Sequence, residues 1–103
     1  MKQLRFLSLE PSPIPHPDKE KILVFMRHGV VVAAAPGIPK DWLTGEQIGC
    51  EMITYAAFDF YWTSIDAWHF ATYNLQLPED FIAVAREHHL DHIRRRADIA
   101  LKA

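Results

Sequence analysis

The stretch TGEQIGCEMITYAAFDFYWTSIDAWHFATYNL, residues 44–75, decides the fold expected from this sequence. It contains all three tyrosines of the chain and two of its three tryptophans. Thr44 and Gln47 have the spacing of a helix capping box, and apolar residues such as Ile48 and Met52 recur behind them at helical spacing. We therefore predict an aromatic helical stretch over residues 44–75, as one long helix or as two helices that meet.

This predicted helix is apolar around most of its circumference. A helix of that kind is buried either in a core or in a partner. A chain of 103 residues has little core with which to surround it, because small domains bury a limited share of their surface. We therefore expect part of the aromatic surface to contact another protein or a second copy of this chain.

The composition limits the class of protein. The 103 residues fit a single domain over residues 1–103, and a hydrophobic content of 50% is enough for a packed core. The net charge of −2 creates no general attraction for nucleic acid. The sequence contains no apolar run long enough to span a membrane and no signal-peptide pattern, and Cys50 is its single cysteine. We expect a cytoplasmic protein with no membrane partner.

The N-terminal third predicts a small antiparallel sheet. Residues 2–10 have the composition of a strand, and the alternating prolines of residues 11–19 indicate an extended Pro-rich connector. Residues 22–26 and 30–35 are β-prone runs separated by Arg-His-Gly, which predicts a hairpin that turns at Gly29. Together these segments predict a three-stranded antiparallel sheet.

The C-terminal segment predicts a second helix. Pro78 suits a first helical position, and the acidic residues Glu79 and Asp80 follow it. An apolar stripe then continues at helical spacing to about residue 102. Because the strands precede the helices, we predict an α+β fold in which two or three helices, including the 78–102 helix, pack on one face of the sheet.

The motif Arg27-His28-Gly29 after a predicted strand resembles the phosphorylated-histidine motif of the histidine phosphatases. That resemblance implies a phosphohistidine at His28 and a large α/β domain with further arginines and a second histidine. This chain is too short for such a domain, and Val30 follows the motif where the family has a polar residue. The sequence therefore favours a hairpin turn at this position.

The run EHHLDH, residues 87–92, contains three of the six histidines. His88 and His92 lie four residues apart, so both project from one face of a helix and have the spacing of two metal ligands. A closed site needs a third ligand, for which Asp59, Asp66 and His69 are the candidates. The alternative is a set of hydrogen-bonded core or edge histidines, and on that basis we predict no metal and no cofactor.

Polar residues also run through the aromatic stretch. Asp59, Asp66 and His69 are surrounded by aromatic residues, where a carboxylate must be paired, solvated or protonated. One interpretation is an acid–base pocket, and the other is a set of structural ion pairs. The arginine run of residues 94–96 has acidic neighbours and no helix-turn-helix pattern, so nucleic-acid binding is not favoured.

The sequence thus favours a small non-enzymatic protein-binding module, an inhibitor or adaptor that masks a partner through an aromatic helical face. The alternative is a metal-dependent or acid–base enzyme that uses the set His88, His92, Asp59, Asp66 and His69. Helical spacing assigns Tyr61, Ile65 and Trp68 to the core. The residues expected to contact the partner are Trp62, Asp66, His69, Tyr73, Arg86, Arg94 and Arg95.

Overall fold

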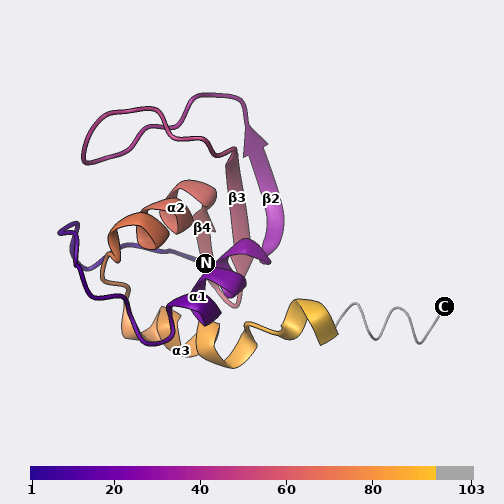
Figure 1. The fold of residues 1–103 in the computed structure, drawn as a ribbon. Coiled ribbons are helices and arrows are strands. Elements are labelled where there is room, and N and C mark those ends of the chain that lie inside the picture. Colours follow the sequence, from indigo (N-terminus) through magenta and orange to yellow (C-terminus); the bar gives the residue numbers. More distant parts are fainter. Residues whose placement is uncertain (95–103) are drawn as a thin grey trace.

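The structure is a computed structural model in which residues 1–94 are described (Figure 1). It confirms the α+β class, with a four-stranded mixed sheet and three helices. The elements in chain order are β1 (Lys2–Gln3), α1 (Lys19–Arg27), β2 (Val30–Ala35), β3 (Met52–Ala57), β4 (Phe60–Thr63), α2 (Ser64–Tyr73) and α3 (Glu79–His88).

The sheet differs from the predicted three-stranded antiparallel one. Its strand order is β1-β4-β3-β2, and β1 runs parallel to β4 while the other neighbours are antiparallel. Two strands, β3 and β4, come from the stretch that was expected to be helical. The sheet is therefore built mostly from the centre of the chain.

The prediction of a helix over residues 44–75 was wrong for its first two thirds. Residues 44–51 belong to a long loop, β3 and β4 form a hairpin, and only Ser64–Tyr73 is helical. In β4 the buried residues Phe60 and Trp62 alternate with the half-buried Tyr61, which is the period of a strand and not of a helix. Apolar residues are so frequent in this stretch that they fit the period of a helix as well as the period of a strand.

The predicted hairpin over residues 21–35 was half wrong. Val30–Ala35 is a strand, but residues 22–26 lie in helix α1. Ile22, Phe25 and Met26 are spaced three and four apart and all three are buried, whereas a strand would have placed its apolar residues on two opposite faces. Burial of one helical face overrides the β propensity of this short run.

The first strand is also shorter than predicted. Of residues 2–10, only Lys2–Gln3 forms a strand, and Ser8 makes an isolated bridge to Gln76. Residues 11–18 contain no helix or strand and lead into α1 at Lys19. The pairing of β1 uses only Phe60 and Tyr61 of β4, and the rest of the predicted strand is irregular.

The capping box occurs at a different place from the predicted one. The Thr44 hydroxyl accepts from the N–H of Glu46 within the loop, whereas Thr63 and Asp66 form a reciprocal capping box at the start of α2. Helix α3 starts after Pro78, as the sequence indicates, but it ends at His88. Residues 91–94 are helical again, and the remainder of the predicted 78–102 helix lies outside the described residues.

The core lies between the sheet and the three helices (Figure 1). The Trp62 ring stacks on Phe25 of α1, with ring centroids 5.4 Å apart, and meets Phe81 of α3 edge-on. Phe70 of α2 joins the same cluster. The helices thus cover the sheet face that carries Phe60 and Trp62. None of the helices in the described part of the chain has the length and hydropathy needed to cross a bilayer.

Candidate functional site

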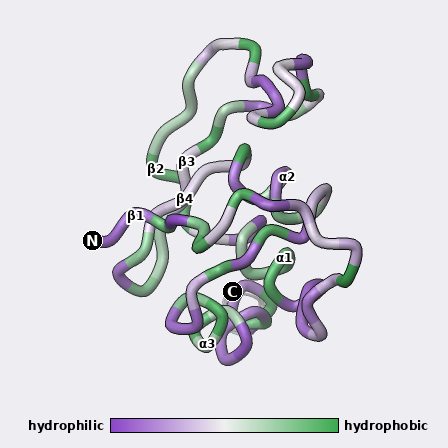
Figure 2. Tube along the Cα trace, turned by 90° about the vertical axis from the view of Figure 1, so that its left-hand side faces the viewer, coloured by the Kyte–Doolittle hydropathy of each residue, from purple (hydrophilic) through white to green (hydrophobic). Residues whose placement is uncertain are grey.

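Strand β2 forms one edge of the sheet and keeps its side chains open to solvent. Within residues 1–94 it pairs with β3 alone, so one row of its backbone N–H and C=O groups faces outward. Val30, Val31 and Val32 are 54%, 58% and 55% exposed, and the alanines that complete the strand are exposed as well. Figure 2 shows this strand in the green of hydrophobic residues.

The β2 strand has few of the features that keep sheet edges from pairing. Natural proteins protect an exposed edge with lysine or other charges, with proline, with a bulge or with a covering element. The sequence VVVAAA contains no charge and no proline. Its protection is limited to an irregularity of register at Val32 and to Pro36 directly after the strand. Such an edge is suited to pairing with another strand.

The opposite edge of the sheet is protected. Strand β1 has two residues, and its Lys2 ammonium forms an ion pair with Asp80, with an N–O distance of 3.0 Å. A short charged edge offers little backbone for pairing. The sheet therefore has one edge that is suited to receive a strand, and it is β2.

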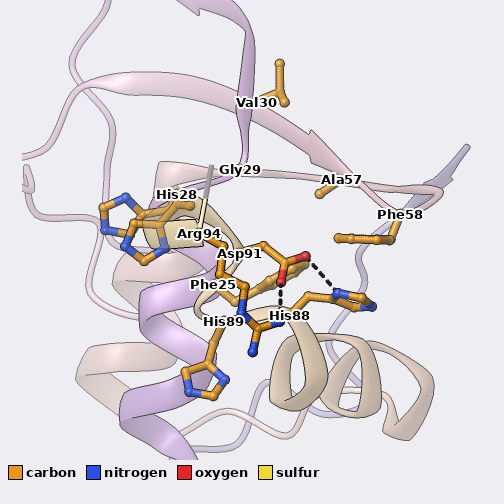
Figure 3. Close-up of a pocket in the computed structure, with 11 residues that line it drawn as sticks. Phe25, His28, Gly29, Val30, Ala57, Phe58, His88, His89, Asp91 and Arg94 are labelled. Atoms are coloured by element: carbon orange, nitrogen blue, oxygen red, sulfur yellow. Dashed lines mark hydrogen bonds and ion pairs between the residues drawn. The ribbon is translucent and has the colours of Figure 1, made fainter. Parts of the chain in front are cut away.

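A hollow of about 480 Å³ lies at the N-terminal end of β2 (Figure 3). The residues before and at the start of β2 form one wall, the β3–β4 hairpin forms a second, and the end of α3 with residues 91–94 forms a third. The side chains that give it chemical character are four histidines, an aspartate, an arginine and two phenylalanines. They are His28, His88, His89, His92, Asp91, Arg94, Phe25 and Phe58.

Asp91 is the one carboxylate among the described residues that line this pocket, and it already has partners. His88 Nδ1 donates to Asp91 Oδ2 over 2.8 Å, and Arg94 Nη1 lies 3.6 Å from Asp91 Oδ1 (Figure 3). Because a carboxylate only accepts hydrogen bonds, the proton of a neutral His88 lies on Nδ1 and its Nε2 is the basic nitrogen. The part of the pocket lining that lies within residues 1–94 therefore carries more imidazole and guanidinium groups than carboxylates.

Aromatic rings form flat walls in the same pocket. The His28 and His92 rings stack at a centroid distance of 3.8 Å and an interplanar angle of 5°. The Phe58 ring stacks on His88 at 4.0 Å and lies 6.3 Å from the Phe25 ring. Two of the predicted metal-ligand candidates, His88 and His92, are thus engaged in ring stacking. The pocket combines apolar faces with hydrogen-bond donors.

The backbone at Phe58 is strained. Phe58 has φ 51° and Asp59 has φ 71°, so both central residues of the β3–β4 turn are in the left-handed region. Two-residue hairpin turns need this conformation, and asparagine and glycine adopt it at lower cost than phenylalanine does. The Phe58 side chain is nevertheless 50% exposed and forms a wall of the pocket. Strained residues of this kind concentrate at binding sites, and the strain marks Phe58 as a candidate binding residue.

The histidines of the described region do not form a metal centre. Across residues 1–94 no group of three or more histidine, cysteine, aspartate or glutamate side chains is arranged to hold a metal ion. Asp59, one of the candidates for a third ligand, is an exposed residue of the turn, and its carbonyl oxygen accepts from the N–H of Lys2. The pocket wall from this hairpin is provided by Phe58 and Ala57 instead.

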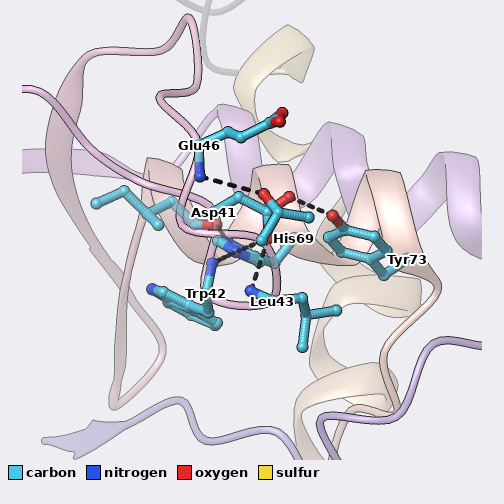
Figure 4. A network of polar contacts seen from close by, with 8 residues as sticks. Asp41, Trp42, Leu43, Glu46, His69 and Tyr73 are labelled. Carbon is cyan, nitrogen blue, oxygen red and sulfur yellow. Dashed lines mark hydrogen bonds and ion pairs between the residues drawn. The ribbon is translucent and has the colours of Figure 1, made fainter.

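A second polar cluster joins the β2–β3 loop to α2 (Figure 4). His69 is 0% exposed; its Nδ1 contacts the carbonyl oxygen of Ile65 over 2.8 Å, and its Nε2 accepts from the N–H of Trp42 over 2.9 Å. The Trp42 ring stacks on the His69 ring at 3.8 Å. Both ring nitrogens are therefore satisfied by a neutral histidine, which fits a structural role.

Asp41 and Tyr73 complete this cluster, because the Tyr73 hydroxyl donates to the Asp41 carboxylate. Burial acts to raise the pKa of Asp41, but hydrogen bonds from Tyr73, from the N–H of Leu43 and from Thr44 outweigh it and hold that pKa below 3.8. The same hydrogen bond raises the pKa of Tyr73 above 10.0. The pair is most stable as carboxylate and neutral phenol.

The assignment of faces on α2 was reversed. Trp62, Asp66 and His69, which were expected to contact a partner, are buried, while Tyr61, Ile65 and Trp68, which were expected to form the core, are half-buried. Trp62 Nε1 donates to the carbonyl oxygen of Met26 over 2.9 Å. The polar side chain of His69 faces inward because the chain's own β2–β3 loop supplies a polar partner for it, the Trp42 N–H.

The remaining predicted residues have separate positions. Asp66 caps α2; burial raises its pKa above 3.8, although hydrogen bonds from Thr63 act in the opposite direction. Arg86 Nε forms an ion pair with Asp18 over 2.8 Å, and Tyr73 is half-buried. Arg94 lines the pocket, and Arg95 lies outside the described residues. The structure does not bring the proposed acid–base set together, because only His88 and His92 of that set line the pocket.

Sequence reasoning missed strand β2 as part of the site. The uncharged run VVVAAA was visible, but its position at a sheet edge depends on the order of the strands. Asp91 is three residues from His88, a spacing that predicts contact on a helix and would have pointed to the pair. No family model, no curated protein and no solved structure matches this chain. The site is therefore interpreted from its geometry.

Proposed function

We propose that this protein is a protein-binding module that receives an extended strand of another polypeptide on the open edge of β2. The observation that carries this proposal is the uncharged β2 strand, whose three valines are 54–58% exposed. Strand addition supplies affinity through backbone hydrogen bonds and specificity through alternate side chains. The partner strand forms hydrogen bonds with the row of β2 backbone N–H and C=O groups that faces outward.

The expected inhibitor or adaptor role remains part of this proposal, with a different surface. The aromatic helical face is occupied by the core and by the β2–β3 loop, so masking of a partner is assigned to β2. A module that captures one strand of a partner masks whatever that strand would otherwise bind. This action needs no catalytic residue and no cofactor.

Selection from a displayed library of random peptides tests this proposal. We expect wild-type protein to enrich apolar, β-prone peptides, because such sequences pair with an uncharged edge. The double substitution Val31→Lys and Val32→Lys should abolish the enrichment, since lysine on an edge strand opposes pairing. Both side chains are exposed, so the fold should tolerate the change.

The matched control is Ala83→Lys, which adds one charge at an exposed position of α3. This variant should retain the enriched peptides at wild-type level. Equal retention of peptides by the β2 double variant and by wild type would show that β2 is not the binding edge.

The His88–Asp91 pair favours a second candidate function, acid–base catalysis in the pocket. A carboxylate that holds the Nδ1 proton of a histidine leaves Nε2 oriented as a base. Hydrolysis of a nitrophenyl ester or phosphodiester, measured for wild type and for His88→Gln, tests this candidate. Equal rates for the two proteins at the level of uncatalysed hydrolysis would eliminate it.

A further inference from the structure

The pocket and the open edge of β2 are parts of one continuous surface. His28 and Gly29 directly precede Val30, the first residue of β2, and all three line the pocket. Figure 3 shows Val30 and Gly29 above the ring pairs. A strand that pairs with β2 and continues past Val30 therefore arrives at His28 and at His92, which stacks on it.

The chemistry of the pocket selects for an anionic group beside an apolar one. Among the described residues, four histidines and Arg94 line the pocket together with one carboxylate, Asp91, which His88 and Arg94 contact. The exposed Glu87 carboxylate lies outside the lining, 3.9 Å from His88 Nε2. Imidazole N–H groups and guanidinium groups are the donors that bind carboxylates. Phe25 and Phe58 supply the apolar wall in the same hollow.

We infer that the pocket binds the C-terminal residue of the partner strand, with its carboxylate on the histidines and Arg94 and its apolar side chain against Phe25 and Phe58. This inference rests on the proposed strand addition to β2. A C-terminal residue is the one peptide unit that combines an apolar side chain with a carboxylate on the same α-carbon. An internal acidic residue offers the charge without the apolar group.

The position of the pocket also sets the direction of the partner. The pocket lies at the N-terminal end of β2, so a strand that ends there runs antiparallel to β2. Antiparallel pairing with β2 extends the pattern that β3 already makes on its other side. The partner is therefore a protein whose last residues are extended, apolar and end in a free carboxylate.

A matched pair of peptide libraries tests this inference. Random peptides as long as β2 are displayed with a free C-terminal carboxylate, and the same peptides are displayed as C-terminal amides. We expect the free acids to bind about tenfold more tightly, as the loss of one charge-assisted hydrogen bond implies. Arg94→Gln should remove most of this difference, while Arg86→Gln, which lies outside the pocket, should leave it unchanged.

The outcomes separate the two proposals. Equal binding of acids and amides, both lost in the Val31→Lys and Val32→Lys variant, would overturn the carboxylate pocket and leave strand addition in place. Binding of acids that survives the β2 substitutions would overturn strand addition and leave an isolated carboxylate site. Retention of no peptide from either library would overturn both proposals.

Discussion

At the scale of single residues, Asp41 and Tyr73 should make stability depend on pH at both extremes. The Asp41 pKa is lowered, so its contribution is present above pH 3.8 and is lost as pH falls through the lowered pKa. The Tyr73 pKa is raised, so its contribution is present below pH 10.0 and is lost as pH rises through the raised value. Thermal unfolding of Tyr73→Phe should therefore vary less with pH than wild type at both ends.

Asp66 and Asp80 also make stability depend on pH in the acidic range, but they do so equally in wild type and in Tyr73→Phe. Asp66 has a raised pKa, so its contribution is present below pH 3.8 and declines as pH rises through its folded value. Asp80 has a pKa lowered by Lys2 and acts in the same direction as Asp41. Both groups are common to wild type and Tyr73→Phe. Parallel pH curves for the two proteins would contradict the role assigned to the Asp41–Tyr73 pair.

His69 should matter more to stability than its larger neighbour Trp68. Replacing His69 by alanine removes the acceptor of the Trp42 N–H and leaves a buried gap, so the free energy of unfolding should fall by about 2–4 kcal/mol. Trp68 is half-buried, and Trp68→Ala should cost about 1–2 kcal/mol. Chemical denaturation measures both, with the exposed Thr72→Ala on the same helix as the reference. A larger loss for Trp68→Ala would restore the sequence-based assignment of faces.

At the scale of elements, the β3–β4 turn should separate stability from binding. Asparagine relieves the left-handed strain at Phe58, by about 1 kcal/mol, which offsets the contacts of a half-exposed ring. Phe58→Asn should therefore leave the unfolding midpoint nearly unchanged and weaken binding of the C-terminal peptide. Phe60→Ala in the same hairpin removes a buried ring and should cost about 3–5 kcal/mol. A large loss of stability in Phe58→Asn would assign the strained residue to the fold and not to binding.

The same hairpin shows how far the sequence could predict the fold. The α+β class and strand β2 were predictable, because runs of β-branched residues followed by helix signals are local features. The turn at Phe58 and Asp59 was not, because phenylalanine is not typical of a left-handed turn, although aspartate is, and the ring of Phe58 is held by stacking on His88. Residues 22–26 form part of a helix because one face of that helix is buried in the core.

The candidate site was predictable in part for a similar reason. His88 and His92 were identified by their spacing as metal-ligand candidates and Arg94 as part of a charged rim, and the structure brings these three into one pocket. The connection of this pocket to β2 depends on the order of the strands in the sheet. The sequence of residues 28–35 carries no local pattern that predicts this order. His69 was placed wrongly because its buried partner, Trp42, lies in a loop far away in the sequence.

At the scale of the whole molecule, the two edges of the sheet should determine the state of assembly. Without a partner strand, the β2 edge of one copy is complementary to the β2 edge of a second, because antiparallel pairing of identical uncharged strands closes about a two-fold axis. The outer edges of that dimer are the short β1 strands with the Lys2–Asp80 ion pair, which oppose further addition. We therefore expect a dimer and not a fibre.

Light scattering at a series of protein concentrations tests this expectation. Wild type should approach the mass of a dimer as concentration rises, and the Val31→Lys and Val32→Lys variant should remain monomeric, while Ala83→Lys should dimerise like wild type. A peptide that pairs with β2 competes for the same backbone groups, so adding it should return the wild-type mass to that of a monomer carrying one peptide, by mass action. If the dimer persists when β2 is saturated with peptide, the second copy binds elsewhere, and the half-exposed Trp68 and Tyr61 become the surface to substitute next.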